Sequence, residues 1–269
     1  MVEVATPGMV EVALLQLRLD ARQSEVPAQA HPLAPVLDQI RRVAAAGAQF
    51  VVLPELWRTG PFELETTIDL AEPLHGQTAT AMSNVAREWS IWLHAGSILE
   101  STADGVYNTS LLFSPTGALA ARYRKRHLFG FNGGEAVFVK AGDEIVVVDT
   151  PLGPTGLATC YDLRFPEHFR ALTDAGAQAV VLTSGWPAVR IAHWDVLTRA
   201  RAIENQVWLL GANAAGSSGT VRLGGHSCVV DPWGEAMVAP DDAAVLTAQL
   251  DADAVTVTRA DFPVLADRR

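Results

Sequence analysis

Cysteine is scarce in this chain, since only Cys160 and Cys228 occur among 269 residues. So few cysteines argue against a disulfide framework and favour a reducing compartment, where a thiol stays free. We therefore expect a cytoplasmic protein. Positive charge is also in short supply, with 20 basic and 30 acidic residues and a formal net charge of −10. This balance argues against nucleic acid or an anionic membrane as the partner.

Long hydrophobic runs are missing as well. No stretch of about 18 apolar residues is present, so we expect no transmembrane helix, and the N-terminus lacks the pattern of a signal peptide. No linker-like stretch divides the sequence, so residues 1–269 are expected to form a single domain. Residues 1–4 are echoed by residues 9–12, which suggests that residues 1–8 are an extension outside the fold.

What the chain does contain is an alternation of strand and helix patterns. Apolar runs or alternation predict strands at 10–17, 50–53, 91–98, 107–113, 119–123, 145–148, 156–159, 179–182, 208–212, 227–230 and 245–250. Helical spacing predicts helices at 35–46, 78–88, 166–175 and 193–205. The alternation implies α/β layers with helices outside, and its two-fold rhythm suggests two sheets packed together.

Cys160 stands at the point where one of these strands meets a helix, in the run Gly156-Leu157-Ala158-Thr159-Cys160-Tyr161-Asp162. At such an elbow the sulfur is presented out of the sheet, and free backbone N–H groups lie close by. Those groups favour a thiolate and can hold an oxyanion. Taken alone, the residue is more typical of a buried structural cysteine, but two further segments change this interpretation.

The first of these segments carries Glu55, which directly follows the apolar run 50–53. A carboxylate there is costly unless it is paired or protonated, and ligand sites in α/β sheets gather at the ends of strands. The second is a basic run in which strand alternation turns Tyr123 and Lys125 to one side and the arginines to the other. Taken alone, the first segment indicates a glutamate paired with a neighbouring group, and the second indicates a solvent-exposed face. Together with Cys160 they predict a shared site.

These motifs resemble those of the nitrilase, or carbon–nitrogen hydrolase, superfamily. The resemblance rests on Pro54-Glu55-Leu56, on Arg124-Lys125-Arg126-His127-Leu128-Phe129, on Cys160-Tyr161-Asp162-Leu163-Arg164-Phe165-Pro166-Glu167, and on later segments at 193–194, 199–206 and 225–234. It implies an α/β fold that forms a four-layer α-β-β-α sandwich. It also implies a Glu-Lys-Cys catalytic triad of Glu55, Lys125 and Cys160. The family's second glutamate, between its lysine and its cysteine, matches Glu135.

The resemblance further implies hydrolysis of a non-peptide amide through a thioester on Cys160. Glu55 would act as general base, and Lys125 with the backbone N–H of Tyr161 would hold the oxyanion. Glu135 would hold Lys125 and help to position the substrate nitrogen or the water. No metal or organic cofactor is needed, and the sequence offers no zinc spacing, phosphate loop or dinucleotide fingerprint.

Two residues near these motifs allow two interpretations each. Trp186 follows the strand at 179–182 and would either form a wall of the substrate pocket or belong to the core. Arg164 could meet a substrate carboxylate, although pairing with Glu167 or Asp162 is the more common arrangement. Cys228 falls inside an apolar strand and is expected in the core.

The motif at Cys160 resembles the branch that contains Nit-type enzymes and ω-amidases, because true nitrilases usually carry Trp-Glu after the cysteine. A small aliphatic amide, such as an ω-amide of a dicarboxylic or keto acid, is thus the expected substrate. An N-carbamoyl compound is the alternative, since the same triad would attack its ureido carbonyl. Two remote alternatives are a papain-like Cys-His enzyme, which needs a histidine to orient Cys160, and a catalytically silent binding protein, whose thiol would be inert.

The family assembles as homodimers or larger homo-oligomers, so the resemblance implies such an assembly for this chain. It places the helix at 166–175 near the contact between subunits. The apolar residues Phe165, Phe169 and Leu172 of this region could equally face the protein's own core.

Overall fold

The computed structural model describes residues 8–19, 30–131 and 133–269. Its strands form two six-stranded sheets and a smaller three-stranded sheet. Of the suggested extension at 1–8, residues 1–7 lie outside the described part of the chain.

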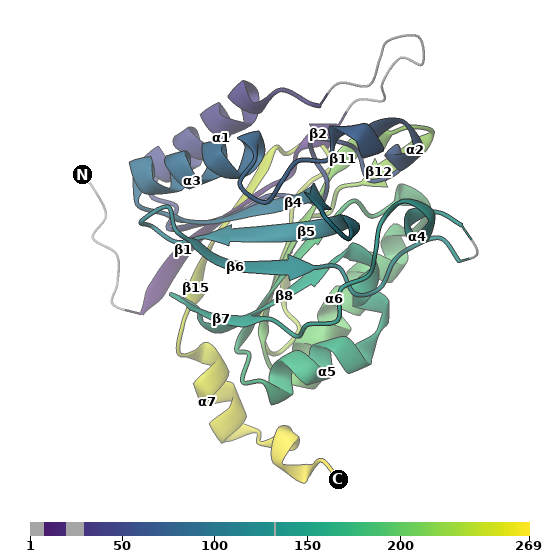
Figure 1. Cartoon of the computed structure of the whole chain (residues 1–269). Coiled ribbons are helices and arrows are strands. Elements are labelled where there is room, and N and C mark those ends of the chain that lie inside the picture. Colours follow the sequence, from purple (N-terminus) through teal and green to yellow (C-terminus); the bar gives the residue numbers. More distant parts are fainter. Residues whose placement is uncertain (1–7, 20–29, 132) are drawn as a thin grey trace.

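The first large sheet has the strand order β15-β1-β3-β4-β5-β6. Its strands are β1 (Met9–Leu15), β3 (Phe50–Val52), β4 (Trp92–Thr102), β5 (Gly105–Phe113), β6 (Leu119–Arg124) and β15 (Val245–Asp251). β1, β3 and β4 are parallel, whereas β5, β6 and β15 pair antiparallel. The helices α1 (Leu33–Ala45) and α3 (Gln77–Trp89) lie together over its outer face (Figure 1).

The second large sheet has the order β14-β13-β10-β9-β8-β7. Its strands are β7 (Val147–Thr150), β8 (Gly153–Thr159), β9 (Ala179–Ser184), β10 (Trp208–Asn213), β13 (Cys228–Val230) and β14 (Ala236–Val238). β8, β9 and β10 are parallel. The helices α5 (Pro166–Asp174) and α6 (Ile191–Asn205) cover the outer face of this sheet (Figure 1).

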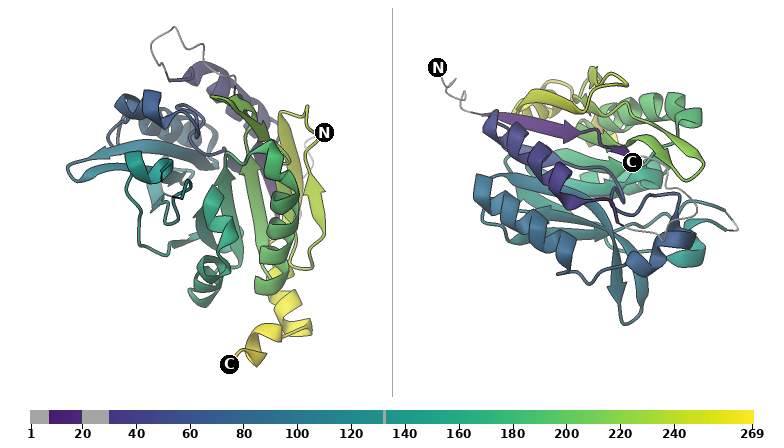
Figure 2. Two further views of the ribbon diagram at one scale, coloured as in Figure 1. Left: turned by 90° about the vertical axis from the view of Figure 1, so that its right-hand side faces the viewer. Right: turned by 90° about the horizontal axis from the view of Figure 1, so that it is seen from above.

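Shorter elements surround these layers. The small sheet consists of β2 (Arg18–Leu19), β11 (Ala215–Ser218) and β12 (Val221–Gly224), and the short helices are α2 (Leu64–Thr67) and α4 (Glu135–Phe138). Single 3-10 turns occupy Ile68–Leu70, Cys160–Arg164, Ala188–Arg190 and Val264–Asp267. The helix α7 (Ala254–Asp261) extends from the body of the molecule toward the C-terminus (Figure 2).

The two large sheets pack face to face through a common apolar core. Phe50 and Val52 of the first sheet and Val181 and Leu210 of the second are at most 1% exposed and belong to one cluster. With a helical layer outside each sheet (Figure 2), the fold is the predicted α-β-β-α sandwich. On α5, Phe169 and Leu172 are fully buried in the protein's own core, while the assembly into oligomers stays a prediction.

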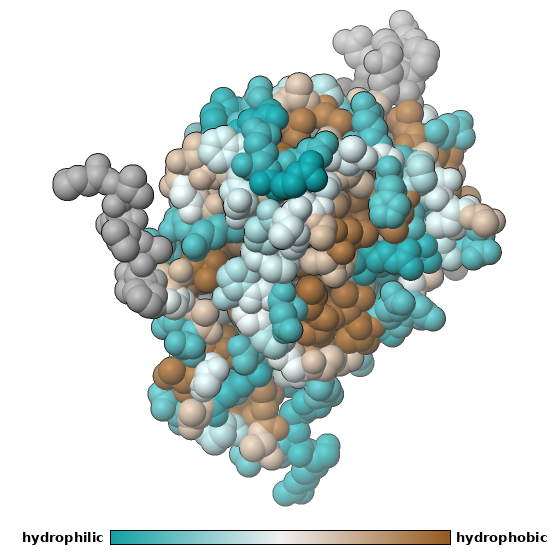
Figure 3. All heavy atoms as spheres, turned by 60° about the vertical axis from the view of Figure 1, so that its left-hand side comes forward, coloured by the Kyte–Doolittle hydropathy of each residue, from teal (hydrophilic) through white to brown (hydrophobic). Residues whose placement is uncertain are grey.

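The outer surface is mixed in character. On the face drawn in Figure 3, hydrophobic residues form separate patches that are divided by hydrophilic residues. Within the described ranges, none of the helices is long and apolar enough to cross a membrane.

Close packing of backbone on backbone fixes the segment that follows β3. In β4 the pairing with β5 shifts register between His94 and Ser97, and Gly96 lies within this irregularity at φ +67°. A Cβ atom on Gly96 would stand 2.0 Å from the carbonyl oxygen of Pro54. Only glycine therefore lets β4 approach the turn that begins at Pro54.

We predict that Gly96→Ala destabilises the protein more than Gly47→Ala. Both glycines have positive φ, so each variant should lose roughly 1–2 kcal/mol to backbone strain. A Cβ on Gly47 would meet nothing within 4 Å, whereas at Gly96 overpacking should cost roughly 1–3 kcal/mol more. Urea unfolding measures the difference, and equal losses for the two variants would contradict the steric explanation.

Candidate active site

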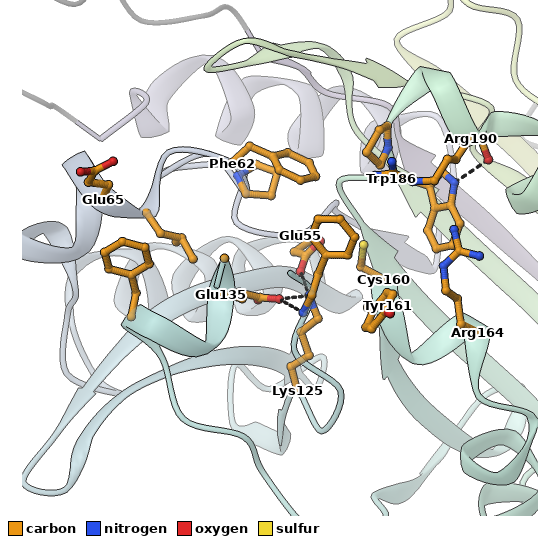
Figure 4. Close-up of a pocket in the computed structure, with 16 residues that line it drawn as sticks. Glu55, Phe62, Glu65, Lys125, Glu135, Cys160, Tyr161, Arg164, Trp186 and Arg190 are labelled. Atoms are coloured by element: carbon orange, nitrogen blue, oxygen red, sulfur yellow. Dashed lines mark hydrogen bonds and ion pairs between the residues drawn. The ribbon is translucent and has the colours of Figure 1, made fainter. Parts of the chain in front are cut away.

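One pocket of about 330 Å³ brings the predicted site residues together. It is lined by Glu55, Lys125, Glu135, Cys160, Tyr161 and Trp186, together with Pro61, Phe62, Leu64, Glu65, Phe129, Gly134, Phe138, Arg164, Pro187 and Arg190. The segments after β3 and β6 supply a carboxylate and an amine, and those after β8 and β9 supply a thiol and an indole. Both large sheets therefore contribute strand ends to the same cavity (Figure 4).

Lys125 lies at the floor of this pocket between two carboxylates (Figure 4). Its Nζ donates to Oε1 of Glu55 at 2.8 Å and to Oε2 of Glu135 at 2.7 Å. As predicted from alternation, the side chains of Tyr123 and Lys125 are buried, at 0% and 2% exposure. An ammonium group has three N–H donors, so one donor is left for a substrate atom.

The charge of this lysine is maintained by its partners. Burial by itself lowers the pKa of Lys125, but the negative charges of Glu135 and Glu55 outweigh this effect and raise the pKa well above its ordinary value. Lys125 is consequently a fixed and almost fully buried positive charge. Such a preorganised charge can stabilise a developing oxyanion.

Asn108 of β5 is a site residue that the sequence interpretation missed. Its Nδ2 donates to Oε1 of Glu55 at 2.9 Å and to Oε1 of Glu135 at 2.8 Å. The side chain is fully buried, so it holds the two carboxylates at a fixed separation around Lys125. The only signal in the sequence is the polar run Asn108-Thr109-Ser110 inside an otherwise apolar strand.

The second oxygen of Glu55 is directed differently. Oε2 accepts the backbone N–H of Gly185 at 3.0 Å, and no other donor to it is found among the described residues. A carboxylate oxygen can accept two hydrogen bonds, so Oε2 retains a site for a proton. Glu55 is itself held by β4, because Leu56 N–H donates to Ser97 Oγ at 3.0 Å on the turn that follows it.

Cys160 occupies a strained elbow between β8 and a 3-10 turn. Its φ is +45°, which is uncommon for a residue with a side chain and typical of functional turns. Thr159 and Asp162 form a reciprocal capping box around this turn. The buried Asp162 also accepts hydrogen bonds from Tyr123 at 2.7 Å and from the backbone N–H of His127 at 3.0 Å. These contacts connect the thiol segment to the lysine segment.

The expectation that this elbow favours a thiolate is wrong for the resting protein. Burial is the largest effect on the pKa of Cys160 and raises it, and the negative charge of Glu55 raises it further. Lys125 lowers the pKa but does not compensate for these two effects. The thiol is therefore protonated at neutral pH and needs a base when it reacts.

The expected pairing of Arg164 with Glu167 or Asp162 is also wrong. Asp162 is satisfied by the partners described above, and Glu167 is exposed. Arg164 instead contacts Nδ1 of His193 at 3.3 Å, and its guanidinium lies 4.7 Å from the ring centroid of Trp186. The guanidinium therefore lines the pocket, where Trp186 forms part of the wall.

Arg190 provides a second guanidinium that the sequence interpretation missed. It lies 5.3 Å above the ring of Phe129 and lines the same pocket. Burial lowers the pKa of Arg164, and repulsion by Arg190 lowers it further. Neither arginine is ion-paired with a carboxylate among the described residues, so this side of the pocket is suited to an anion. No group of three or more His, Cys, Asp or Glu residues in the described ranges could hold a metal ion.

Comparison with known proteins agrees with this fold and this pocket. Residues 11–260 match the carbon–nitrogen hydrolase family, and the chain belongs to that family. The expectations of an enzyme and of the Nit-type branch are confirmed by the relatives that it matches.

Two curated relatives and one solved structure illustrate the similarity. A 2-oxoglutaramate amidase of Paenarthrobacter nicotinovorans is 41% identical, over 97% of this chain and 90% of that protein. Omega-amidase NIT2 of Homo sapiens is 35% identical, over 96% and 94%. The crystal structure of Saccharomyces cerevisiae Nit3 superimposes with a TM-score of 0.84 at 29% identity, covering 97% of each chain.

We predict that alkylation of Cys160 by iodoacetamide keeps accelerating with pH through pH 9. Its pKa lies above the ordinary value of 9.0, and the thiolate is the reacting species. Measurement of the modified peptide by mass spectrometry gives the rate at each pH. The buried Cys228, whose pKa is raised to about 12, serves as an internal control. A plateau of the Cys160 rate below pH 7 would show a preformed thiolate and contradict the prediction.

Proposed function

We propose that the protein hydrolyses the terminal amide of a small ω-amide of a dicarboxylic or 2-oxo acid, and that it releases ammonia and the free acid. The observation that carries this proposal is the buried set of Glu55, Lys125 and Glu135 beside the thiol of Cys160. The similarity to a 2-oxoglutaramate amidase and to an ω-amidase supports the choice of substrate.

The first half of the reaction forms a thioester. Oε2 of Glu55 accepts the proton of Cys160 as the sulfur attacks the amide carbon, which is the help that a protonated thiol requires. The oxyanion binds the remaining N–H of Lys125 and the backbone N–H of Tyr161. Loss of one such donor typically costs about 3–4 kcal/mol. Glu55 then gives its proton to the nitrogen, the carbon–nitrogen bond breaks, and ammonia leaves.

The second half returns the thiol. Glu55 accepts a proton from a water molecule, and the resulting hydroxide attacks the thioester carbon. The carbon–sulfur bond breaks, the acid is released, and the proton returns to the sulfur of Cys160. Glu135 keeps Lys125 in position during both halves of the reaction. Its carboxylate lies close enough to the ammonium group of Lys125 to orient the substrate nitrogen or the attacking water molecule. The net reaction is amide plus water to acid plus ammonia.

The two arginines would recognise the far end of the substrate. A guanidinium group binds a carboxylate through two parallel hydrogen bonds, and Arg164 and Arg190 both face the cavity without a carboxylate partner. A substrate carboxylate would relieve the repulsion between them. We therefore place the carboxylate of the ω-amide on the side of Trp186 (Figure 4).

We expect the wild-type protein to release ammonia from glutaramate-type monoamides and the Cys160→Ala variant to release none. Ammonia is measured by a coupled assay across a panel of ω-amides and N-carbamoyl acids. Release of carbon dioxide together with ammonia would instead identify an N-carbamoyl substrate. Absence of ammonia with every carboxylate-bearing amide would contradict the proposed function.

We expect Arg164→Gln and Arg190→Gln each to lower kcat/KM for a carboxylate-bearing amide by about 10- to 100-fold, because a hydrogen bond to a charged group contributes roughly 1.5–3 kcal/mol. For uncharged butyramide the same variants should change kcat/KM much less. The exposed Arg222, outside the pocket, provides the control variant Arg222→Gln. Equal losses on both substrates would argue against recognition of a carboxylate.

A further inference from the structure

The pocket has two unlike walls on opposite sides of Cys160. Figure 4 shows Trp186, Arg164 and Arg190 on one side of the thiol, and Phe62, Glu65 and Glu135 on the other. The first wall carries the two guanidinium groups to which the proposed function assigns the substrate carboxylate. The second wall has no role in the hydrolysis of a primary amide beyond the contribution of Glu135.

This second wall is built by α2, α4 and the segment before α2, and its lining is mostly apolar. Leu64 of α2 is 5% exposed and packs in the same hydrophobic cluster as Phe138 of α4. The ring of Phe62 packs edge-on against Phe129 at 5.9 Å between centroids. Phe62, Leu64 and Phe138 all line the cavity, so an apolar surface faces it beside Glu135.

The direction of the bound substrate decides which group meets this surface. The acyl chain and the nitrogen are attached to opposite sides of the amide carbon. If the acyl chain runs from Cys160 toward Arg164 and Arg190, the nitrogen points toward Glu135 and the apolar wall. With a primary amide, the departing ammonia is too small to contact this wall. A cavity of about 330 Å³ lies in the range of pockets that enclose ligands considerably larger than a small primary amide.

We propose that the wall of Phe62, Leu64 and Phe138 binds an apolar substituent on the amide nitrogen, so that the enzyme also hydrolyses secondary N-alkyl ω-amides. This inference rests on the proposed function. The carbon–sulfur bond forms as before, Glu55 gives its proton to the substituted nitrogen, and the carbon–nitrogen bond breaks to release a primary amine. Water then hydrolyses the same thioester.

The proposal makes a quantitative statement about chain length. Each methylene group that is transferred from water to an apolar wall favours binding about fourfold. For N-methyl, N-ethyl, N-propyl and N-butyl amides of one dicarboxylic acid, kcat/KM should therefore rise about fourfold per carbon until the wall is covered. Primary amine is measured by derivatisation, and the unsubstituted amide is assayed in parallel by ammonia release.

Two substitutions in this wall should change the preference for the length of the N-alkyl chain in opposite directions. Leu64→Phe fills the space and should lower the ratio of kcat/KM for the N-butyl amide over the primary amide at least tenfold. Phe138→Ala enlarges the space and should shift the optimum toward longer chains. Val137 is the neighbour of Phe138 on α4, is 67% exposed and does not line the pocket, so Val137→Phe is a control whose ratio should equal that of wild type.

The outcomes separate this inference from the function on which it rests. Turnover of the primary amide with N-alkyl amides more than 100-fold slower, or with no dependence on chain length, would overturn the apolar subsite and leave the amidase intact. A lowered ratio in the Val137→Phe control equal to that in Leu64→Phe would overturn it as well. Failure of the wild type on every primary and secondary amide would remove both proposals.

Discussion

A buried ammonium group between two buried carboxylates is the interaction on which the rest of this structure depends. Lys125, Glu55 and Glu135 come from three separate segments, and each side chain is at most 6% exposed. Removal of one member of such a set leaves an uncompensated charge in a low-dielectric interior, which is strongly destabilising. The three segments therefore depend on one another for their stability in the folded protein.

The contact between the two sheets determines where the thiol of Cys160 lies relative to the carboxylate of Glu55. Glu55 follows a strand of the first sheet, and Cys160 follows a strand of the second. Hydrogen bonds join the sheets beside the pocket, from Thr183 Oγ1 to the carbonyl oxygen of Leu53 at 2.8 Å and between Ser110 and Thr159 at 3.0 Å. Because packed sheets do not slide without loss of such contacts, the sandwich holds Glu55 and Cys160 in a fixed relative position.

The sequence predicts most of the long elements, because they have a clear physical pattern, although the eight-residue helix α7 is not predicted. Continuous apolar runs identify β3 and β9, and helical spacing identifies α1 and α6 to within two residues of their ends. The short elements β2, β11, β12, β14, α2 and α4 span two to four residues. They are too short to show a period, so tertiary contacts alone determine them.

The residues of the pocket likewise divide into those that a local sequence pattern reveals and those that it does not. Glu55, Lys125 and Cys160 stand at strand ends, where a charged residue or a thiol next to an apolar or alternating strand pattern can be recognised in the sequence. Asn108 lies within a strand, and its importance comes from two carboxylates that are far away along the chain. Arg190 ends a 3-10 turn, and only the fold brings it beside Arg164. Residues whose role depends on partners distant in sequence leave no local pattern to read.

The protonated state of Cys160 has a consequence for oxidative damage. Peroxides react with thiolates, and the oxidation of cysteine beyond sulfenic acid is largely irreversible. A thiol that stays protonated is a poor target for peroxide. Burial of the thiol, together with the negative charge of Glu55, raises the pKa of Cys160 and thereby also protects the sulfur from oxidants.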